Sequence, residues 1–391
     1  MLLAQTEVPL FAPTTYGDGN TYERGYHMPR VSKRRQTSIV YAMTNAADSN
    51  EVVAFRRRAN GTLVRVNTYA TGGSGTGVRE VSQATPQDGI DPLASQGSLS
   101  LSRDGRFLFA VNAGSSSISS FRVLKSGALV LADVEPSGGA QPNSLDAFGN
   151  LLYVSNVGDA FNSFDSNVTG FRVESDGRLT RIISSTRSLS TVDAQPARVI
   201  FSPTGRQLVV SELTTNRLSV FLVNGDGTLM GPTVNNSSGG GPFGSYFLSS
   251  GLLLVSEAGS NALSSYTVDA NGTTRVISSS IPSGGMATCW VVASRDENFA
   301  YASNTDSGTI TTYRISSSGT LAFVRTTRSV PQGMSAGPID SGVSSDGRNF
   351  YVLNGAQGTI SAFRIRGDGR LVGIQVVPGL PALGAQGLAV H

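Results

Sequence analysis

A short signature recurs seven times along this 391-residue chain: an aromatic residue is followed six positions later by glycine. The seven pairs are Phe55/Gly61, Phe121/Gly127, Phe171/Gly177, Phe221/Gly227, Tyr266/Gly272, Tyr313/Gly319 and Phe363/Gly369. In all but the fifth pair, a leucine stands two residues after the glycine. The pattern predicts a strand that ends near the aromatic residue, a hairpin turn that contains the glycine, and a return strand.

An apolar run closed by Asn or Glu precedes each of these aromatic residues. The closing residues, called anchors below, are Asn45, Asn112, Asn156, Glu212, Glu257, Asn304 and Asn354. Successive anchors lie 44 to 67 residues apart, which is the spacing of four-stranded propeller blades. A further short run precedes most anchors, so each repeat is interpreted as strands a to d, with the anchor at the end of strand b.

The two ends of the chain complete the pattern. Residues 386–390 repeat the strand-a pattern of residues 96–100, and no such strand precedes the first anchor. We therefore expect an all-β fold, a seven-bladed β-propeller of four-stranded antiparallel blades, closed by pairing of the C-terminal strand with the N-terminal blade. Residues 38–391 are expected to form this single domain, and residues 1–37 an N-terminal extension.

Two segments are longer than the repeat requires. Residues 71–95 join strand d of one blade to strand a of the next, and residues 157–167 lengthen a turn between strands b and c. In an up-and-down blade these two connections emerge on the same face, so both are expected to overhang one mouth of the central channel. Long loops on a rigid scaffold are where binding and catalytic residues concentrate.

Composition narrows the classes of partner. Charged residues make up 15% of the chain, the net charge is +3, and no apolar run reaches 18 residues. The basic cluster at residues 30–35 precedes the repeats and is expected to solvate a tail. Cys289 is the single cysteine, which excludes an intramolecular disulfide and a Cys-based zinc site. We expect no nucleic-acid partner, no membrane insertion and a monomer.

The sequence gives only weak evidence on the cellular location of the protein. The apolar stretch at the N-terminus is too short for a signal peptide. Five glycosylation sequons, at Asn60, Asn167, Asn235, Asn236 and Asn271, slightly favour an extracellular or periplasmic location, with the cytoplasm as the alternative.

Six stretches resemble one known family. They are Tyr41 with Thr44, Asn45 and Asn50, and residues 91–99, 111–115, 242–244, 255–258 and 289–292. The chain is similar over about residues 38–391 to the lactonase-type seven-bladed propellers. That family includes cycloisomerase-type 6-phosphogluconolactonases and fungal 3-carboxy-cis,cis-muconate lactonizing enzymes. The resemblance implies the propeller fold and the hydrolysis or formation of a lactone of a small carboxylated or phosphorylated substrate at the channel mouth.

The chain departs from this family at one point. The resemblance implies a histidine together with Arg and Glu residues in the central mouth. Here residues 195–201 keep Arg198 but hold no histidine, and the two histidines, His27 and His391, lie outside the repeat anchors.

The chemistry of a lactone requires a proton-transfer group and stabilisation of an oxyanion or carboxylate. Glu212 and Glu257 are the two anchors that carry a carboxylate, and they belong to adjacent blades. Arg198 enters the blade of Glu212 and suits bidentate recognition of a carboxylate or phosphate. These three residues are the candidate catalytic group. The alternative is that each anchor side chain caps its own turn.

Other residues at the starts of the inner strands are candidates for substrate binding. They are Gln96, Asn143, Trp290 and Asp340, joined by the anchor Asn304. For Trp290 the alternative is a core position between blades. A ring of Asn and Glu oxygens could also hold Ca²⁺, but the similar family is not generally metal-dependent, so we expect no cofactor and no metal site.

A second class of function stays open. A non-catalytic secreted or surface propeller that binds a protein or glycan partner predicts exposed aromatic side chains on the insertions, with Phe161 and Phe164 as candidates. A lactone enzyme predicts instead a pocket at the mouth where Glu212, Glu257 and Arg198 converge, with at least one perturbed pKa.

Overall fold

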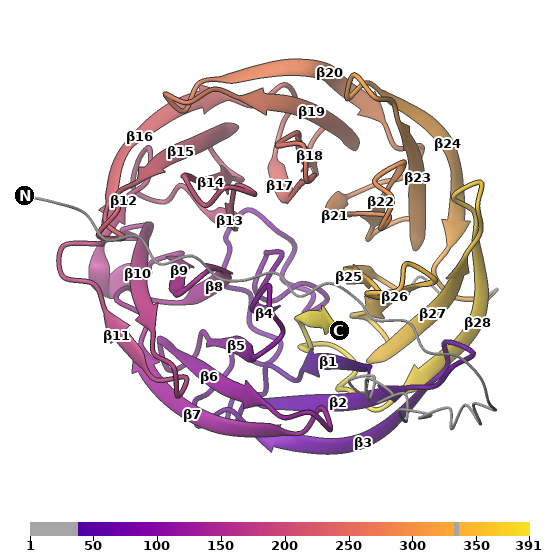
Figure 1. Cartoon of the computed structure of the whole chain (residues 1–391), viewed down its shortest axis with the longest axis horizontal. Coiled ribbons are helices and arrows are strands. Elements are labelled where there is room, and N and C mark those ends of the chain that lie inside the picture. Colours follow the sequence, from indigo (N-terminus) through magenta and orange to yellow (C-terminus); the bar gives the residue numbers. More distant parts are fainter. Residues whose placement is uncertain (1–37, 332–335) are drawn as a thin grey trace, which may run out of the picture. The chain divides into compact units, whose positions relative to one another are not determined.

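The computed structural model describes residues 38–331 and 336–391, and within them seven antiparallel β-sheets form a ring (Figure 1). The expected fold class is confirmed. The expected N-terminal extension, residues 1–37, lies outside the described residues.

In blades 2 to 7 the first strand in the chain is the inner strand at the channel and the last is the outer strand. Blade 1 begins with its second strand, because its inner strand comes from the C-terminus. In chain order, blades 1 to 3 consist of β1 (Ile39–Met43), β2 (Glu51–Arg57) and β3 (Leu63–Ala70); β4 (Leu99–Leu101), β5 (Phe107–Asn112), β6 (Ser117–Val123) and β7 (Leu129–Pro136); and β8 (Pro142–Phe148), β9 (Leu151–Asn156), β10 (Asn167–Val173), β11 (Leu179–Arg181) and β12 (Arg187–Ser188).

The remaining blades are regular. Blades 4 to 7 consist of β13 (Pro196–Phe201), β14 (Gln207–Glu212), β15 (Arg217–Val223) and β16 (Leu229–Asn236); β17 (Pro242–Phe247), β18 (Leu253–Glu257), β19 (Ala262–Val268) and β20 (Thr274–Pro282); β21 (Thr288–Ala293), β22 (Phe299–Asn304), β23 (Thr309–Ile315) and β24 (Leu321–Arg328); and β25 (Pro338–Val343), β26 (Asn349–Asn354), β27 (Thr359–Ile365) and β28 (Leu371–Pro378).

The ring closes in blade 1 as expected. The C-terminal strand β29 (Leu388–Val390) is its inner strand and pairs antiparallel with β1, with Tyr41 opposite Ala389. The Ser38 hydroxyl donates to the carbonyl oxygen of His391 at 2.8 Å, which fastens the two segments together.

The seven signature glycines explain why the repeat is so regular. All seven lie in the turn between strands c and d with φ between +77° and +92°, a region in which a Cβ is strained. Each also faces the preceding blade. A Cβ at Gly127 would overlap Ile39 of blade 1, and one at Gly61 of blade 1 would overlap Asn349 of blade 7. The glycine therefore serves the hairpin and the contact between blades at once.

A tyrosine hydroxyl holds several of these turns. Tyr41, Tyr153, Tyr301 and Tyr351, on the second strands of four blades, donate to the carbonyl oxygens of Gly127, Gly227, Gly369 and Gly61 in the next blade around the ring, at 2.6–3.2 Å. Each tyrosine is buried, so the bond stabilises the blade interface without competition from water.

Removing one such hydroxyl tests this contact. We expect Tyr351→Phe to lower the free energy of unfolding by about 1 kcal/mol, because the Gly61 carbonyl loses its buried donor while the ring still fills its site. Urea denaturation measures the change. Tyr69→Phe, on an outer strand with a half-buried ring, is the control. An unchanged midpoint for Tyr351→Phe would show that water replaces the hydroxyl.

Blade 3 departs from the regular pattern. Its outer strand is broken into β11 and β12, which both pair with β10. The 157–167 insertion contains the short 3-10 helix η1 (Ala160–Asn162), whose first turn is capped by the Asp159 carboxylate. Within residues 38–331 and 336–391, no helix has the length and apolar character needed to span a membrane.

Candidate functional site

The long loop after β3 enters the channel. Residues 91–98, called the crossing segment below, pass through the centre of the ring before β4 begins, as Figure 1 shows by the purple chain inside the strands. The sequence predicted a loop that overhangs the mouth. The structure shows that its last eight residues lie within the channel and replace most of the inner strand of blade 2, which is only three residues long.

Groups from several blades hold the crossing segment. The Trp290 indole Nε1 donates to the Ser95 carbonyl oxygen at 3.0 Å. The Gln96 side chain spans to blade 6, where its Nε2 donates to the carbonyl oxygen of Val291 at 2.9 Å. The backbone N–H of Gln96 donates to Ala197 of blade 4.

Two amides complete these contacts from the other side. The Asn143 Nδ2 donates to the carbonyl oxygens of Leu93 and Pro196. The Gln386 side chain accepts from the Leu93 N–H at 2.7 Å and donates to the Ser95 carbonyl oxygen at 2.7 Å. Asn143 and Trp290, expected as substrate contacts, therefore bind the protein's own backbone.

Arg198 lies beneath the crossing segment. It is buried, its Nη1 donates to the carbonyl oxygens of Gln96 and Leu145 at 3.3 and 3.4 Å, and its Nη2 lies 3.9 Å from the Asp146 carboxylate. Its Nε has no partner among the described residues. The positive charge of Arg198 is thus enclosed by protein groups.

Asp340 faces the same region from blade 7. Its carboxylate is 3% exposed and accepts the N–H of Gly387 at 2.9 Å. Burial raises the pKa of Asp340 to about 7, while the N–H groups of Gly387 and Gly97 and the charge of Arg198 act in the opposite direction. At neutral pH this carboxyl therefore holds a proton for part of the time.

The raised pKa of Asp340 predicts a pH dependence of stability. Between about pH 4 and pH 7 the folded protein keeps a proton that the unfolded chain releases, so folding stability contributed by this group falls as pH rises, by at most about 1.4 kcal/mol per pH unit. We expect Asp340→Asn to make the slope shallower across this window. The slope does not vanish, because Glu80 has a pKa raised to about 8 and acts in the same direction. Urea denaturation across the window compares the two proteins, and equal slopes would contradict the assignment.

The anchors lie away from the crossing segment and are surrounded by hydroxyl and N–H donors. Glu212 is fully buried and accepts from the Ser219 hydroxyl at 2.5 Å, from Thr215, and from both the N–H and hydroxyl of Ser190. Glu257, equally buried, accepts from the hydroxyls of Ser264 and Ser280 and from the N–H of Gly239.

The anchor Asn304 also bonds hydroxyl groups, but its side chain is the donor. Its Nδ2 donates to the hydroxyls of Thr309 and Thr311. Five anchors bond a Ser or Thr hydroxyl seven residues later, across the hairpin of strands b and c. The five pairs are Asn112/Ser119, Glu212/Ser219, Glu257/Ser264, Asn304/Thr311 and Asn354/Ser361.

The structure therefore separates the predicted site residues into two sets. Arg198, Gln96, Asn143, Trp290 and Asp340 come together around the crossing segment. The anchors Glu212, Glu257 and Asn304 lie within the hairpins of their own blades, and the hydrogen bonds that the structure shows for them do not reach Arg198.

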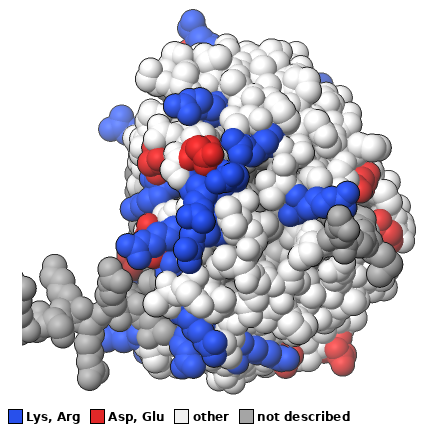
Figure 2. Space-filling model, turned by 90° about the vertical axis from the view of Figure 1, so that its right-hand side faces the viewer, with Lys and Arg blue, Asp and Glu red and all other residues white. Residues whose placement is uncertain are grey.

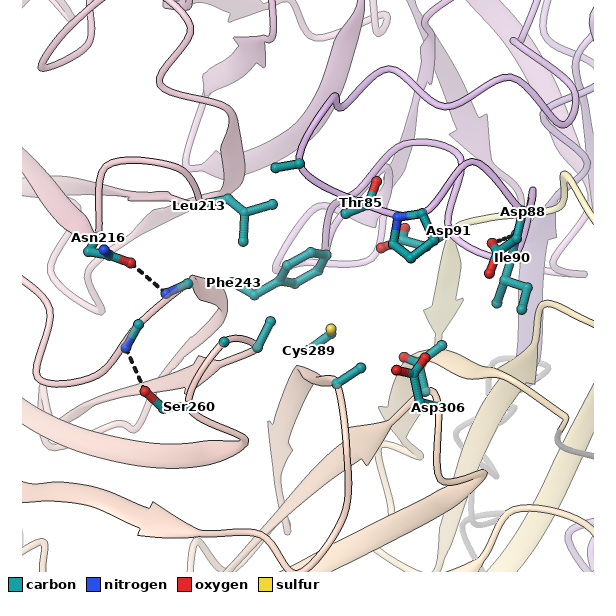
Figure 3. A pocket seen from close by; sticks show the side chains of 18 residues that line it. Thr85, Asp88, Ile90, Asp91, Leu213, Asn216, Phe243, Ser260, Cys289 and Asp306 are labelled. Atoms are coloured by element: carbon teal, nitrogen blue, oxygen red, sulfur yellow. Dashed lines mark hydrogen bonds between the residues drawn. The ribbon is translucent and has the colours of Figure 1, made fainter.

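A pocket opens beside the crossing segment, on the face that carries the anchors (Figure 3). It has a volume of 510 Å³ and is lined by the 84–91 part of the loop, by the turns after the anchors of blades 4 to 6, and by the first residues of the inner strands of blades 5 and 6. Figure 3 shows Leu213 and Phe243 on one side, Asp88 and Asp91 on the other, and Cys289 between them.

Asp91 gives this pocket its chemistry. Its Oδ1 has no hydrogen-bond partner among the described residues. Burial raises the pKa of Asp91 well above its usual range, and the charges of Glu80 and Asp340 raise it further. Hydrogen bonds from the Gln386 side chain and the Ser95 backbone act in the opposite direction. The carboxyl therefore keeps its proton to higher pH than an ordinary aspartate does, which suits a group that donates a hydrogen bond or a proton to a ligand in the pocket.

Comparison with known proteins supports the fold of the whole propeller and matches a family model to part of the sequence. The family described as lactonase, seven-bladed beta-propeller, matches residues 49–159, a stretch that includes the crossing segment and Asp91. The resemblance to the lactonase-type propellers is confirmed. No curated protein sequence matches this chain.

Solved structures show the same fold over nearly the whole chain. A protein provisionally assigned as a 6-phosphogluconolactonase, from Bacteroides fragilis, is 17% identical with a TM-score of 0.70, and the match covers 92% of this chain and 98% of that one. The periplasmic gluconolactonase of Pseudomonas aeruginosa is 19% identical with a TM-score of 0.68, and the match covers 90% and 98%. At these identities the likeness shows the fold.

Two acidic residues of the pocket were missed by sequence reasoning. Asp91 stands within one of the stretches that carry the family resemblance, yet nothing in the sequence shows that it lines a pocket. Asp306 follows the anchor Asn304 by two residues and is exposed at the pocket. Their common signal is an acidic residue in a connection on the anchor face.

The thiol of Cys289 reports on this pocket. Burial raises the pKa of Cys289 well above its usual range, and the charges of Asp91 and Asp306 add to the effect. Because the thiolate is the reactive form, we expect iodoacetamide to alkylate Cys289 about tenfold or more slowly in the folded protein than in the urea-unfolded chain. Mass spectrometry measures both rates, and comparable rates would show that the thiol is open and ionised.

The two insertions meet at a second cavity. It has a volume of 490 Å³ and is lined by residues of both, including Arg79, Glu80, Phe161 and Phe164. Phe161 is 100% exposed and Phe164 is 39% exposed. The exposed aromatic side chains expected of a partner-binding propeller are thus present.

Proposed function

We propose that the chain opens a lactone ring in the pocket beside the crossing segment. One observation carries this proposal: two carboxyl groups, the partly buried Asp91 and the exposed Asp306, line one cavity whose walls are mainly apolar. Hydrolysis of a lactone requires attack by water on the carbonyl carbon and protonation of the ring oxygen as it leaves, and the raised pKa of Asp91 suits the second task.

The residues of the pocket have complementary roles in this scheme. The apolar side chains of Phe243 and Leu213 hold the ring. The exposed carboxylate of Asp306 takes a proton from the attacking water, and Asp91 gives its proton to the leaving ring oxygen. The product is a hydroxy acid, and proton exchange with solvent restores both carboxyls. Trp290 and Gln96 are positioning residues, because they hold the segment that carries Asp91.

Hydrolysis assays on a panel of sugar and alkyl lactones test the proposal. We expect Asp91→Asn and Asp306→Asn each to lower kcat by about 100-fold, the usual contribution of one acid or base. Asp48→Asn, an exposed carboxylate outside the pocket, is the matched control and should keep full activity. A wild-type protein that opens no lactone, or an Asp91→Asn variant with unchanged kcat, would overturn it.

The family resemblance extends this proposal in two directions. It implies a carboxylated or phosphorylated substrate and allows the reverse reaction, lactone formation. It also implies catalysis by a histidine together with Arg and Glu residues at the channel mouth, of which this chain keeps Arg198. Arg198 and the two glutamate anchors, Glu212 and Glu257, remain the candidates for such a role. All three side chains are buried, so each can have a structural role, and only variants can distinguish that role from a catalytic one.

A second candidate function is binding of a protein or glycan partner through the insertions. The supporting observation is Phe161, which η1 holds fully exposed beside the second cavity. In this case Phe161→Ser abolishes capture of the partner from extracellular material, whereas Ile183→Ser, also highly exposed, leaves capture unchanged.

We also propose an extracellular or periplasmic location. It is supported by three sequon asparagines, Asn60, Asn236 and Asn271, which are exposed, and by the structural likeness to a periplasmic protein. Asn167, in contrast, is buried at the start of β10. Cell fractionation tests the location.

A further inference from the structure

We infer that the pocket selects its ligand by charge: it accepts a ring compound that is uncharged or carries an ammonium group, and it excludes an anionic one. This inference rests on the lactone-opening function proposed above and narrows its substrate class. The substrate class inferred here differs from the carboxylated or phosphorylated substrate that the family resemblance implies.

The ionisable carboxyl groups of the lining can carry only negative charge, and Asp91, with its raised pKa, contributes least of it. Asp88, Asp91 and Asp306 line the pocket, and none of the described residues that line it is Lys or Arg. The chain is not short of cations, since it has 30 Lys and Arg. Figure 2 shows many Lys and Arg side chains on the outer side of the ring. Among the described residues, Arg314, Arg364 and Arg370 of blades 6 and 7 are exposed.

Backbone donors do not replace the missing side-chain cations. Glycine-rich turns bind phosphate or carboxylate when their N–H groups are free. Here the N–H of Gly240 donates to the Ser260 hydroxyl at 2.6 Å, and that of Gly241 donates to the Asn216 amide oxygen at 2.7 Å, as the dashed lines in Figure 3 show. The N–H of Gly259 donates to the Gly240 carbonyl oxygen. These glycines are therefore not an anion cradle.

Arg198 does not compensate for the acidic lining either. Its guanidinium is enclosed under the crossing segment, bonded to two carbonyl oxygens and close to Asp146. Two groups in the pocket, the Asp91 carboxyl and the Cys289 thiol, both have pKa values raised further by neighbouring carboxylates. An anion placed between them would face the same repulsion from these carboxylates.

Three probes of nearly equal shape test the inference: benzylamine, which is a cation at neutral pH, benzyl alcohol and benzoate. Isothermal titration calorimetry or ligand-observed NMR at low ionic strength measures their dissociation constants. We expect benzylamine to bind most tightly and benzoate at least about tenfold more weakly, with the difference shrinking as salt is added. Asp306→Asn should reduce the preference for the amine several-fold, and Asp48→Asn should leave it unchanged. Benzoate binding as tightly as benzylamine, or no binding by any probe, would overturn the inference.

A turnover assay separates this inference from the proposed function. Glucono-δ-lactone and its 6-phosphate form a pair that differs by the anionic group alone. If the probes bind in the expected order and neither lactone is opened, the proposed function fails and the charge selection stands. If the phosphorylated lactone is opened with the higher kcat/KM, the charge selection fails and the lactone-opening function stands.

Discussion

Gly97→Ala is expected to be among the most damaging single substitutions in this chain, with a loss of about 3 kcal/mol or more in the free energy of unfolding. Gly97 lies near the end of the crossing segment with φ at +86°. A Cβ there would overlap the Arg198 guanidinium and approach the Ser144 hydroxyl. Arg198 has no room to withdraw, because it is buried and held by two carbonyl oxygens.

Two other glycines separate the causes of this effect. Gly149 has φ at +59° and nothing within reach of a Cβ, so Gly149→Ala measures backbone strain alone, about 1 kcal/mol. Gly225 has open space and no left-handed φ, so Gly225→Ala should change stability by no more than about 0.5 kcal/mol. Urea denaturation of the three variants measures the series. If Gly97→Ala were no worse than Gly149→Ala, the crossing segment would not be packed as described.

The two glutamate anchors should have the second large effect. We expect Glu212→Ala and Glu257→Ala each to cost about 3 kcal/mol of stability, because each leaves several buried hydroxyl and N–H donors without an acceptor. Serine-rich hairpins that depend on a buried carboxylate cannot replace it with water.

Conservative variants distinguish this structural role from a catalytic one. Glu212→Gln and Glu257→Gln keep the size of the side chain and exchange one acceptor for a donor, as in the five Asn anchors. If the glutamates are structural, melting temperature falls and the activity of the folded fraction is retained. Loss of activity at unchanged stability, shared by Arg198→Ala, would instead establish a catalytic role for all three residues.

The fold was predictable because its signals are local and repeated. The glycine of each signature combines a left-handed φ with a contact to the preceding blade, so the same residue type recurs seven times. Ring closure was predictable for the same reason, since the C-terminal strand carries the pattern of an inner strand. The broken outer strand of blade 3 was not, because the 157–167 insertion alters pairing two strands away.

The candidate site was predictable only in part. Trp290, Gln96 and Asp340 were identified as channel residues, and they do meet. Their role as supports of the crossing segment depends on where the 71–98 loop runs, which long-range contacts decide. The pocket carboxyl of Asp91 was missed because its chemistry comes from burial and from neighbours such as Asp340, which is far away in the sequence.

The crossing segment also bears on the order in which the chain folds. Its hydrogen bonds join residues that are 195 positions apart at Gln96 and Val291, and 293 apart at Leu93 and Gln386. Each blade can form from residues that are close in sequence, but the contacts in the channel cannot form until the C-terminal residues have folded into place. Contacts of such high sequence separation are formed slowly. The final step of folding should therefore be the ordering of the channel interior, and the pocket beside it should be completed last.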